Sequence, residues 1–574
     1  MTRVGVDTGG TFTDAVFADG TIAKVPSTPD DPSRAVATVA GGRGVSVLAH
    51  GTTVATNALL ERKGVRVALV TNAGLEDVVE IARQDRPSLY DSFVDRPVPL
   101  VARGDRLGIA GRLDAHGVEI EALAGSLAVP EGVAAVAVCL LHADLNPVHE
   151  QAVALALRAG GYDVTCSHEV SPELREYERT VTTVANAYVR PLCAAYLRRL
   201  ANVVPQTLVM SSAGGLLALD IAAEQPVRLL LSGPAAGVRA AAAIASENGY
   251  PNAVSFDMGG TSTDVCLILG GIPEPAPSLS VGGFPIRVPS LDIHTIGAGG
   301  GSIARLDAGG ALTVGPESAG ARPGPACYGL GGTAATVTDA DRVLGRIPPG
   351  AVFPGLGELN GGAARAALAR ARLDAADVVT VVDANMAQAV RKVTVERGVD
   401  PAPLALVAFG GAGPLHACAL AEALDMTVVI VPARAGVFSA VGLLCAPEQY
   451  DTVESWPSPL SHDGLPAPAD DVSLDCRYVG QSHELTVASV DAFHDEHERR
   501  NGYARRDRAV EVIAVRRRTT VAAPLSFADL APVTRGPVVG PMTLSEPDCT
   551  IWVPEGWAGR VGVGGALILE RAQP

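Results

Sequence analysis

Short apolar runs separated by glycine pairs are the most regular pattern along the chain. One run covers residues 3–7 and resumes at 15–17, and another covers 253–257 and resumes at 265–269. Runs of this length, rich in valine, predict β-strands, and the glycines between them predict a tight turn. The pattern therefore predicts two strand–turn–strand units, one near the start of the chain and one near its middle.

The rest of the pattern predicts an α/β protein of several domains. Apolar runs at 65–70 and 133–141 predict strands, whereas residues 171–200 show the apolar spacing of a helix. A proline- and aspartate-rich stretch at 456–471 predicts a linker, and 574 residues are too many for one core. We expect an N-terminal α/β domain at 1–175, a core at 176–455 and a small β-rich domain at 472–574.

The two predicted turns carry the same phrase. The first reads Asp7-Thr-Gly-Gly-Thr-Phe-Thr-Asp14, and the second reads Asp257-Met-Gly-Gly-Thr-Ser-Thr-Asp264. Six of the eight positions are identical, which for segments so far apart indicates two related half-molecules. Each half would then offer one loop to a shared ligand.

The residue types in this phrase suit bound phosphate. Glycines permit positive φ and a close ligand, and threonine hydroxyls add donors beside free N–H groups. An aspartate at each strand end could hold Mg²⁺ through its water molecules. We expect nucleotide phosphates at Thr8, Gly9, Gly10, Thr11, Thr13, Asp14, Gly259, Gly260, Thr261, Thr263 and Asp264, with Asp7 and Asp257 as catalytic residues that hold the Mg²⁺.

Two matched phosphate hairpins are typical of the actin-like ATPase fold, in which duplicated ribonuclease H-like domains enclose ATP. A Walker A loop does not fit, because no Gly-Lys-Ser/Thr follows the glycines. A dinucleotide-binding fingerprint does not fit either, because its glycine turn leads into a helix, whereas these turns lead into a strand. A third glycine-rich segment, at 404–416, runs from an apolar strand into a predicted helix, whose N-terminus favours an anion. We expect Gly410, Gly411 and Gly413 to hold the nucleoside.

Composition and charge narrow the class of protein. With 45 basic and 62 acidic side chains the net charge is −17, which argues against nucleic acid and an anionic membrane surface as partners. No apolar run approaches the ~20 residues that span a bilayer, and the chain opens on a predicted strand rather than a signal peptide. The nine cysteines form no Cys-x-x-Cys pair, so we expect a reduced, cytoplasmic protein.

A second candidate site lies at residues 287–302. Asp292 and His294 stand two positions apart, a spacing that on a strand points both side chains to one face. They could bind a second divalent metal, zinc or manganese, or form a catalytic base with its orienting partner. The alternative is a structural histidine beside a turn-capping aspartate. The triple glycine at 299–301 favours function, because it lets a substrate approach the backbone.

Ordered phrases along the whole chain resemble the hydantoinase A / 5-oxoprolinase family. Besides the two aspartate phrases they include His50-Gly-Thr-Thr-Val-Ala-Thr-Asn57, Ser232-Gly-Pro-Ala-Ala-Gly237 and Phe409-Gly-Gly-Ala-Gly-Pro-Leu-His416. The resemblance implies an actin-like ATPase core that uses ATP to open a cyclic amide, and in most relatives a separate B-type subunit. One departure from the family pattern is a shorter region after residue 444.

The resemblance and the phosphate phrases together predict an enzyme. We expect the substrate carbonyl oxygen to attack the γ-phosphate, after which water attacks the activated carbon; Asp292 and His294 would face the substrate or this water. The ring could be a hydantoin, 5-oxoproline or a related lactam, and the chain would be the A-type subunit of a homo- or hetero-oligomer. Two alternatives are an ATP-dependent ketone carboxylase subunit, which needs bicarbonate, and a non-catalytic nucleotide-gated assembly module.

Overall fold

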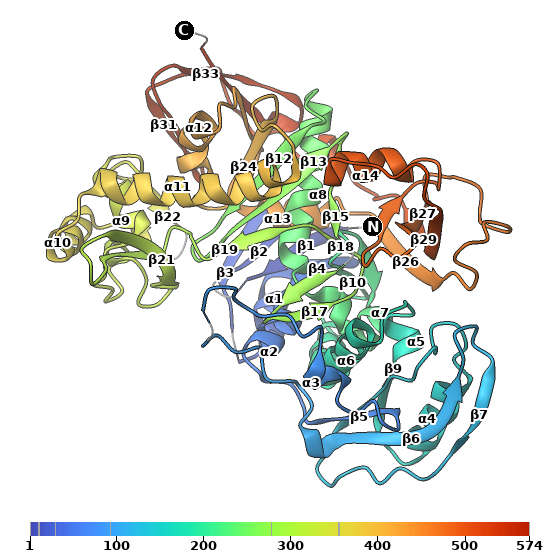
Figure 1. Cartoon of the computed structure of the whole chain (residues 1–574). Helices are drawn as coiled ribbons and strands as arrows, with labels where there is room; N and C mark the ends of the chain where they lie inside the picture. The colour runs from blue at the N-terminus through green and yellow to red at the C-terminus, as the bar shows by residue number, and fades with distance from the viewer. Residues whose placement is uncertain are drawn as a thin grey trace.

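The computed structural model describes residues 2–9, 12–28, 30–91, 93–276, 278–353 and 356–572. Two large sheets with helices packed against them form the body of the protein, and a smaller sheet projects from one end (Figure 1). The expected α/β class is confirmed.

The first large sheet has ten strands. From edge to edge they are β28 (Leu485–Val487), β27 (Val472–Tyr478), β29 (Val510–Val521), β26 (Glu448–Ser455), β11 (Leu216–Ala218), β10 (Gln206–Met210), β4 (Val47–Thr52), β1 (Arg3–Thr8), β2 (Phe12–Phe17) and β3 (Ile22–Pro26). β1 pairs antiparallel with β2 and parallel with β4, which pairs parallel with β10.

The second large sheet repeats this order. Its path is β14 (Ile272–Pro273), β13 (Thr263–Leu269), β12 (Ala253–Met258), β24 (Ala405–Phe409), β25 (Val428–Val431), β34 (Leu567–Arg571), β33 (Trp557–Val561) and β30 (Val538–Val539), and β19 (His294–Ile296) pairs with β13. β12 pairs antiparallel with β13 and parallel with β24, which pairs parallel with β25. The same order around a matching hairpin confirms the duplicated actin-like architecture.

Helices join the two halves as well as covering them. α8 (Ser232–Glu247) leads into β12, and α13 (Phe438–Leu444) packs against both α8 and β1. This packing needs a glycine, because a methyl group on Gly442 would stand 2.2 Å from the carbonyl oxygen of Ala236. The other described α-helices are α1 (Pro32–Ala40), α2 (Val54–Leu60), α3 (Val78–Ile81), α4 (Val148–Ala159), α5 (Ser167–Val170), α6 (Glu176–Leu200), α7 (Leu219–Glu224), α9 (Val337–Val343), α10 (Gly361–Ala371), α11 (Ala375–Val393), α12 (Gly413–Ala423) and α14 (Phe493–Asn501).

A separate five-stranded sheet forms between α2 and α6. Its order is β7 (Glu119–Ala124), β6 (Arg106–Leu113), β5 (Val67–Asn72), β8 (Ala135–Val138) and β9 (Asp163–Cys166). Two-stranded sheets pair β15 (Pro275–Ala276) with β18 (Ser290–Leu291), β16 (Leu279–Val281) with β17 (Phe284–Ile286), β20 (Ser302–Leu306) with β21 (Leu312–Ser318), β22 (Val352–Phe353) with β23 (Gly357–Glu358), and β31 (Met542–Ser545) with β32 (Thr550–Val553).

The C-terminal part of the chain contributes to both large sheets. β26 to β29 extend the first sheet, whereas β30, β33 and β34 extend the second. The boundaries 1–175, 176–455 and 472–574 stay predictions. Among the helices that the structure describes, none is both long enough and apolar enough to cross a membrane.

Candidate nucleotide site

The two sequence phrases form matching hairpins. Asp7, near the end of β1, lies opposite Asp14 on β2, and Asp257, near the end of β12, lies opposite Asp264 on β13. The predicted strand–turn–strand units are therefore confirmed. Each hairpin presents a pair of carboxylates at an equivalent place in its sheet.

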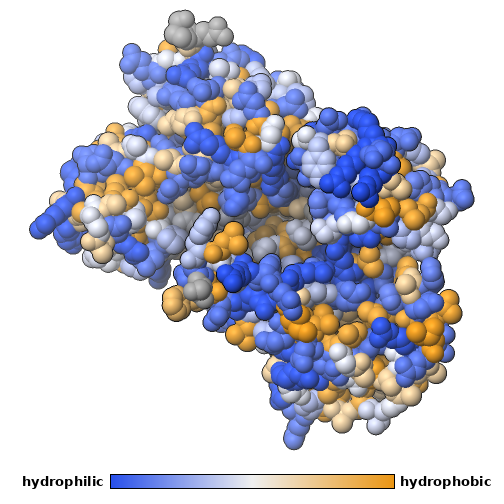
Figure 2. All heavy atoms as spheres, in the orientation of Figure 1, coloured by the Kyte–Doolittle hydropathy of each residue, from blue (hydrophilic) through white to orange (hydrophobic). Residues whose placement is uncertain are grey.

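A cavity of about 460 Å³ lies between the hairpins. Figure 2 shows the molecular surface hollowed between the part that carries α11 and the part that carries α1 and α2. The volume falls within the usual range of small-molecule sites. The predicted residues that line the cavity are Asp7, Gly9, Asp14, Asp257, Gly259, Gly260, Thr261, Asp264, Gly410 and Gly411.

Burial and like charge raise the pKa values of these aspartates. Burial, and then the nearby carboxylate of Asp14, raises the pKa of Asp7 to about 7, against the opposing effect of Lys24. Burial raises the pKa of Asp264 to about 6. The pKa of Asp257 lies well above its ordinary value because of burial and the carboxylates of Asp264 and Asp7. The two hairpins therefore act on each other electrostatically.

The donor set of this cavity fits Mg²⁺ carried in with ATP. Carboxylate oxygens and water are the ligands that Mg²⁺ takes in proteins, and a cation would relieve the repulsion that raises these pKa values. Lys24 is the one cationic side chain among the described residues that line the cavity, and its Nζ lies 2.8 Å from Asp14 Oδ1. A polyphosphate would therefore need a metal ion to balance its charge here.

The threonines of the two phrases differ in their surroundings. Thr261 lines the cavity, whereas Thr13 and Thr263 are fully buried. Thr13 Oγ1 lies 3.1 Å from Ser27 Oγ, and Thr263 Oγ1 donates to the carbonyl oxygen of Ala298 at 2.6 Å. These two hydroxyls therefore stabilise the hairpins from within the protein, and phosphate binding by Thr13 and Thr263 stays a prediction.

Four other predicted contacts are absent from the cavity lining or cannot be placed. Thr8 is buried on β1, and Gly413 is the first residue of α12; neither is among the described residues that line the cavity. Gly10 and Thr11 lie outside the described residues. The ligand contacts assigned to these four stay predictions.

The predicted nucleoside loop folds against the second hairpin. Gly410 has a φ of +81°, and its N–H donates to the carbonyl oxygen of Ala435 at 2.9 Å. The N–H of Ala412 donates to the carbonyl oxygen of Met258, also at 2.9 Å. A methyl group on Gly410 would stand 2.4 Å from Asp257 Oδ1. The loop is therefore in direct contact with the second aspartate.

The first turn of α8 is a part of the site that we did not predict from the sequence. Gly233 and Pro234 line the cavity, and a methyl group on Gly233 would lie 3.7 Å from Asp7 Oδ1. The N-terminus of a 16-residue helix thus faces the hairpins, where its free N–H groups favour an anion. The Ser-Gly-Pro phrase at 232–234 was visible in the sequence, but nothing in it indicates a ligand.

Two further polar residues of the cavity were also missed. Ser439, on the first turn of α13, lies beside Asp257 in the cavity lining and opposes the rise in the pKa of that carboxyl. Asp548, between β31 and β32, accepts a hydrogen bond from the N–H of Gly436 at 2.8 Å. No motif marks either residue, because each comes from a segment that only the fold brings to the cavity.

Asp292 and His294 are not among the described residues that line the cavity. His294 begins β19 opposite Val265, whereas Asp292 precedes that strand and forms an ion pair with Arg397. The strand on which we expected both side chains therefore includes only His294. Among the described residues, three or more ligand atoms of His, Cys, Asp and Glu lie within 4.8 Å of one another at Glu150–Cys166–His168 and at Glu546–Asp548–Cys549, and neither group includes Asp292 or His294. Metal or substrate binding by Asp292 and His294 stays a prediction.

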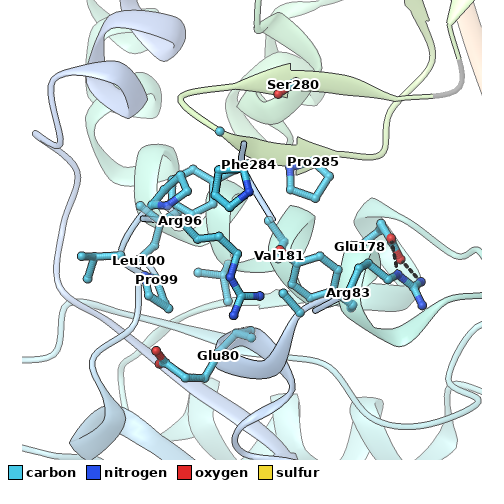
Figure 3. A pocket seen from close by; sticks show the side chains of 18 of the residues that line it. Glu80, Arg83, Arg96, Pro99, Leu100, Glu178, Val181, Ser280, Phe284 and Pro285 are labelled. Carbon is cyan, nitrogen blue, oxygen red and sulfur yellow. Dashed lines mark hydrogen bonds and ion pairs between the residues drawn. The ribbon is translucent and has the colours of Figure 1, made fainter. Parts of the chain in front are cut away.

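A larger cavity, of about 790 Å³, lies between residues 79–101, α6 and the hairpin of β16 and β17. Figure 3 shows Arg83 paired with Glu178 on one side and Phe284 beside Pro285 above the opening. None of the predicted site residues is among the described residues that line it. The residues that we expected to bind nucleotide thus line the smaller cavity, where the two hairpins meet.

Comparison with known proteins shows which family the sequence matches. Residues 3–161 match the family described as "Hydantoinase/oxoprolinase N-terminal region", and residues 179–451 match "Hydantoinase/oxoprolinase". The caprolactamase subunit alpha of Pseudomonas jessenii is 35% identical over 89% of this chain and 86% of its own length. The acetophenone carboxylase gamma subunit of Aromatoleum aromaticum is 35% identical over 77% of this chain and 67% of its own.

A solved structure has the same fold along the whole chain. The crystal structure of the ATP-dependent caprolactamase from Pseudomonas jessenii superimposes with a TM-score of 0.84 at 29% identity, and the match covers 100% of both chains. The two family matches together cover more than half of the sequence. The chain belongs to the hydantoinase/oxoprolinase family.

Proposed function

We propose that this chain is an ATP-dependent hydrolase that opens a cyclic amide or imide. The observation that carries the proposal is the pair of matched hairpins, which brings four aspartates from two halves of the chain to one cavity. Such a site suits a metal-bound polyphosphate. Similarity to a caprolactamase subunit supports a cyclic amide as the second substrate.

ATP would lie with its phosphates between the hairpins and its nucleoside beside Gly410 and Gly411. Asp7 and Asp257 would hold Mg²⁺, which when bound offsets the charge that develops on the transferring phosphoryl group. The first turn of α8 would add backbone N–H donors to the phosphates. Binding both substrates in one cavity would supply most of the catalysis, because phosphoryl transfer depends chiefly on positioning.

The chemistry would proceed in two stages. The carbonyl oxygen of the amide attacks the γ-phosphorus, the bond from phosphorus to the β,γ-bridging oxygen breaks, and ADP leaves. The amide N–H proton passes to a base, which gives an O-phosphorylated imidate. Water then adds to the activated carbon, and the carbon–nitrogen bond of the tetrahedral adduct breaks as the departing amine takes up a proton, which leaves an acyl phosphate. A second water attacks the acyl carbon, the carbon–oxygen bond to phosphate breaks, and the products are a carboxylate and phosphate.

A B-type subunit is the proposed protein partner. The two relatives named above are described as subunits. On the loop between α3 and β6, the side chains of Leu89, Tyr90 and Phe93 are 79%, 100% and 93% exposed. Large apolar side chains gathered in water are typical of a protein–protein contact, so we assign this loop to that subunit.

A phosphate-release screen tests the proposed function. The purified chain, alone and co-expressed with a B-type subunit, is incubated with MgATP and either cyclic amides or ketones, with and without bicarbonate. We expect at least one hydantoin, 5-oxoproline or lactam to raise phosphate release by about tenfold or more, without any need for bicarbonate. Release that needs a ketone and bicarbonate would indicate a carboxylase. Release that responds only to a protein would indicate an assembly module.

A further inference from the structure

His416 lies in a buried cluster of charges behind the nucleotide cavity. It belongs to the first turn of α12 and is completely buried. Its Nδ1 lies 2.7 Å from Asp383 Oδ1 on α11, and its Nε2 lies 3.2 Å from Asp341 Oδ2 on α9. Three helices therefore meet at one imidazole.

The cluster holds this imidazole in its cationic form. Burial alone would lower the pKa of His416, but the carboxylates of Asp341 and Asp383 raise it to about 9. Arg346 supplies a second cation, with its Nη1 3.6 Å from Asp341 Oδ1. Two carboxylates thus face two cations. Buried charges need such opposite partners, because they have lost the stabilisation that water gives them. Both ring nitrogens then carry protons: Nδ1–H donates to Asp383, whereas Nε2–H faces Asp341 as an ion pair.

On one side the cluster connects to the second phosphate hairpin. The backbone N–H and the hydroxyl of Thr338, at the start of α9, both donate to the carbonyl oxygen of Gly300, at 2.8 and 2.7 Å. The N–H groups of Gly300 and Gly301 donate to the carbonyl oxygens of Gly259 and Gly260, at 3.0 and 2.6 Å. The helix that carries Asp341 is therefore fastened to glycines that line the cavity.

On the other side the cluster connects to the nucleoside loop. α12 begins at Gly413, immediately after residues 410–412, so one turn of helix connects His416 to that loop. Gly410 and Gly411 line the cavity together with the hairpin glycines Gly259 and Gly260. The imidazole thus lies between a helix that is bonded to the second phosphate hairpin and a helix that continues from the nucleoside loop.

We propose that His416 is a positioning residue for the nucleotide: through Asp341 and Asp383 it holds the nucleoside loop in register with the second phosphate hairpin. The inference rests on the proposed function, because it takes the cavity to bind ATP. The folded-state pKa is raised above the ordinary 6.5, so the stabilisation is complete below that pH and is lost as the pH rises through about 9. Nucleotide affinity should weaken over the same interval.

Calorimetric titration with a non-hydrolysable ATP analogue and Mg²⁺ tests this inference. We expect the wild-type Kd to rise roughly tenfold between about pH 7.5 and 9.5, and His416→Gln to have the weaker affinity already at the lower pH. Asp383→Asn removes one of the carboxylates that hold the proton. It should therefore move the loss of affinity to lower pH, which a purely structural role would not do.

His497→Gln is the matched control, because His497 is equally buried and hydrogen-bonded but belongs to α14 and does not line the cavity. It should keep the wild-type affinity and pH dependence. A wild-type Kd that stays flat, or a folded His416→Gln variant with wild-type affinity, would overturn the inference. If His416→Gln does not fold, an unshifted pH profile in Asp383→Asn would overturn it. Failure of the wild type to bind any nucleotide would instead contradict the proposed function.

Discussion

Replacing Asp257 with asparagine is expected to abolish substrate-dependent ATP turnover. The carboxylates of Asp264 and Asp7 act electrostatically on Asp257, which also lies beside Gly410 of the nucleoside loop. The asparagine variant would lose the negative charge that holds Mg²⁺ against the phosphates. We expect kcat for phosphate release to fall by about 10³-fold or more at saturating MgATP and substrate.

Asp105→Asn is the matched control for this variant. Asp105 is also a buried aspartate, and it forms an ion pair with Arg66 at 2.7 Å. It immediately precedes β6 of the five-stranded sheet and is not among the described residues that line the cavity. Its replacement should leave kcat unchanged.

The stability of the Asp257→Asn variant provides a second readout. It should unfold at or above the wild-type temperature in the absence of ligand, because burial and repulsion disfavour the negative charge of Asp257 in the folded protein. A folded Asp257→Asn protein with wild-type turnover would disprove the role assigned to Asp257.

Replacing Gly410 with alanine is expected to damage both stability and nucleotide use. The residue has a φ of +81°, and the added methyl group would stand 2.4 Å from Asp257 Oδ1 and 2.5 Å from the carbonyl oxygen of Met258. Such backbone strain costs about 1–3 kcal/mol before any steric clash. Displacement of the loop or of Asp257 should lower kcat/KM for ATP by about 100-fold. Thermal unfolding and steady-state kinetics measure the two effects.

The neighbouring residue offers an internal control. A methyl group on Gly411 would meet no atom of the described residues within 4 Å, apart from its two chain neighbours. Gly411→Ala should therefore keep the wild-type unfolding temperature, and any effect should appear in KM for ATP, because Gly411 lines the cavity. Equal losses of stability in the two variants, or full activity of Gly410→Ala, would contradict the contact between the loop and Asp257.

The hairpins and the duplicated fold could be predicted because their signals are local and repeated. A strand–glycine–strand phrase determines its own turn, and its second copy indicated that the two halves are equivalent. The strand period also bears on Thr13 and Thr263, which we expected to contact phosphate together with the aspartates that follow them. Asp14 and Asp264 line the cavity, so Thr13 and Thr263, one position earlier, must face the opposite side of their strands.

The remainder of the site depends on contacts between distant segments. Ser439 and Asp548 reach the cavity only because α13 and the loop between β31 and β32 pack against it. Asp292 illustrates the reverse case. Local spacing placed it beside His294, but the strand begins only at His294, and the carboxylate of Asp292 pairs with Arg397, more than 100 positions later in the sequence. Neither the approach of Ser439 and Asp548 to the cavity nor the pairing of Asp292 with Arg397 is indicated by the local sequence.

The fate of the substrate's carbonyl oxygen tests most directly whether ATP activates the amide by phosphoryl transfer. The cyclic amide identified in the screen would be labelled with ¹⁸O at its carbonyl, and the released phosphate analysed by mass spectrometry. We expect one ¹⁸O atom in phosphate for each ring opened, because the carbonyl oxygen becomes bonded to phosphorus before its bond to carbon breaks. Unlabelled phosphate, with all of the ¹⁸O retained in the carboxylate product, would contradict activation through a phosphorylated amide.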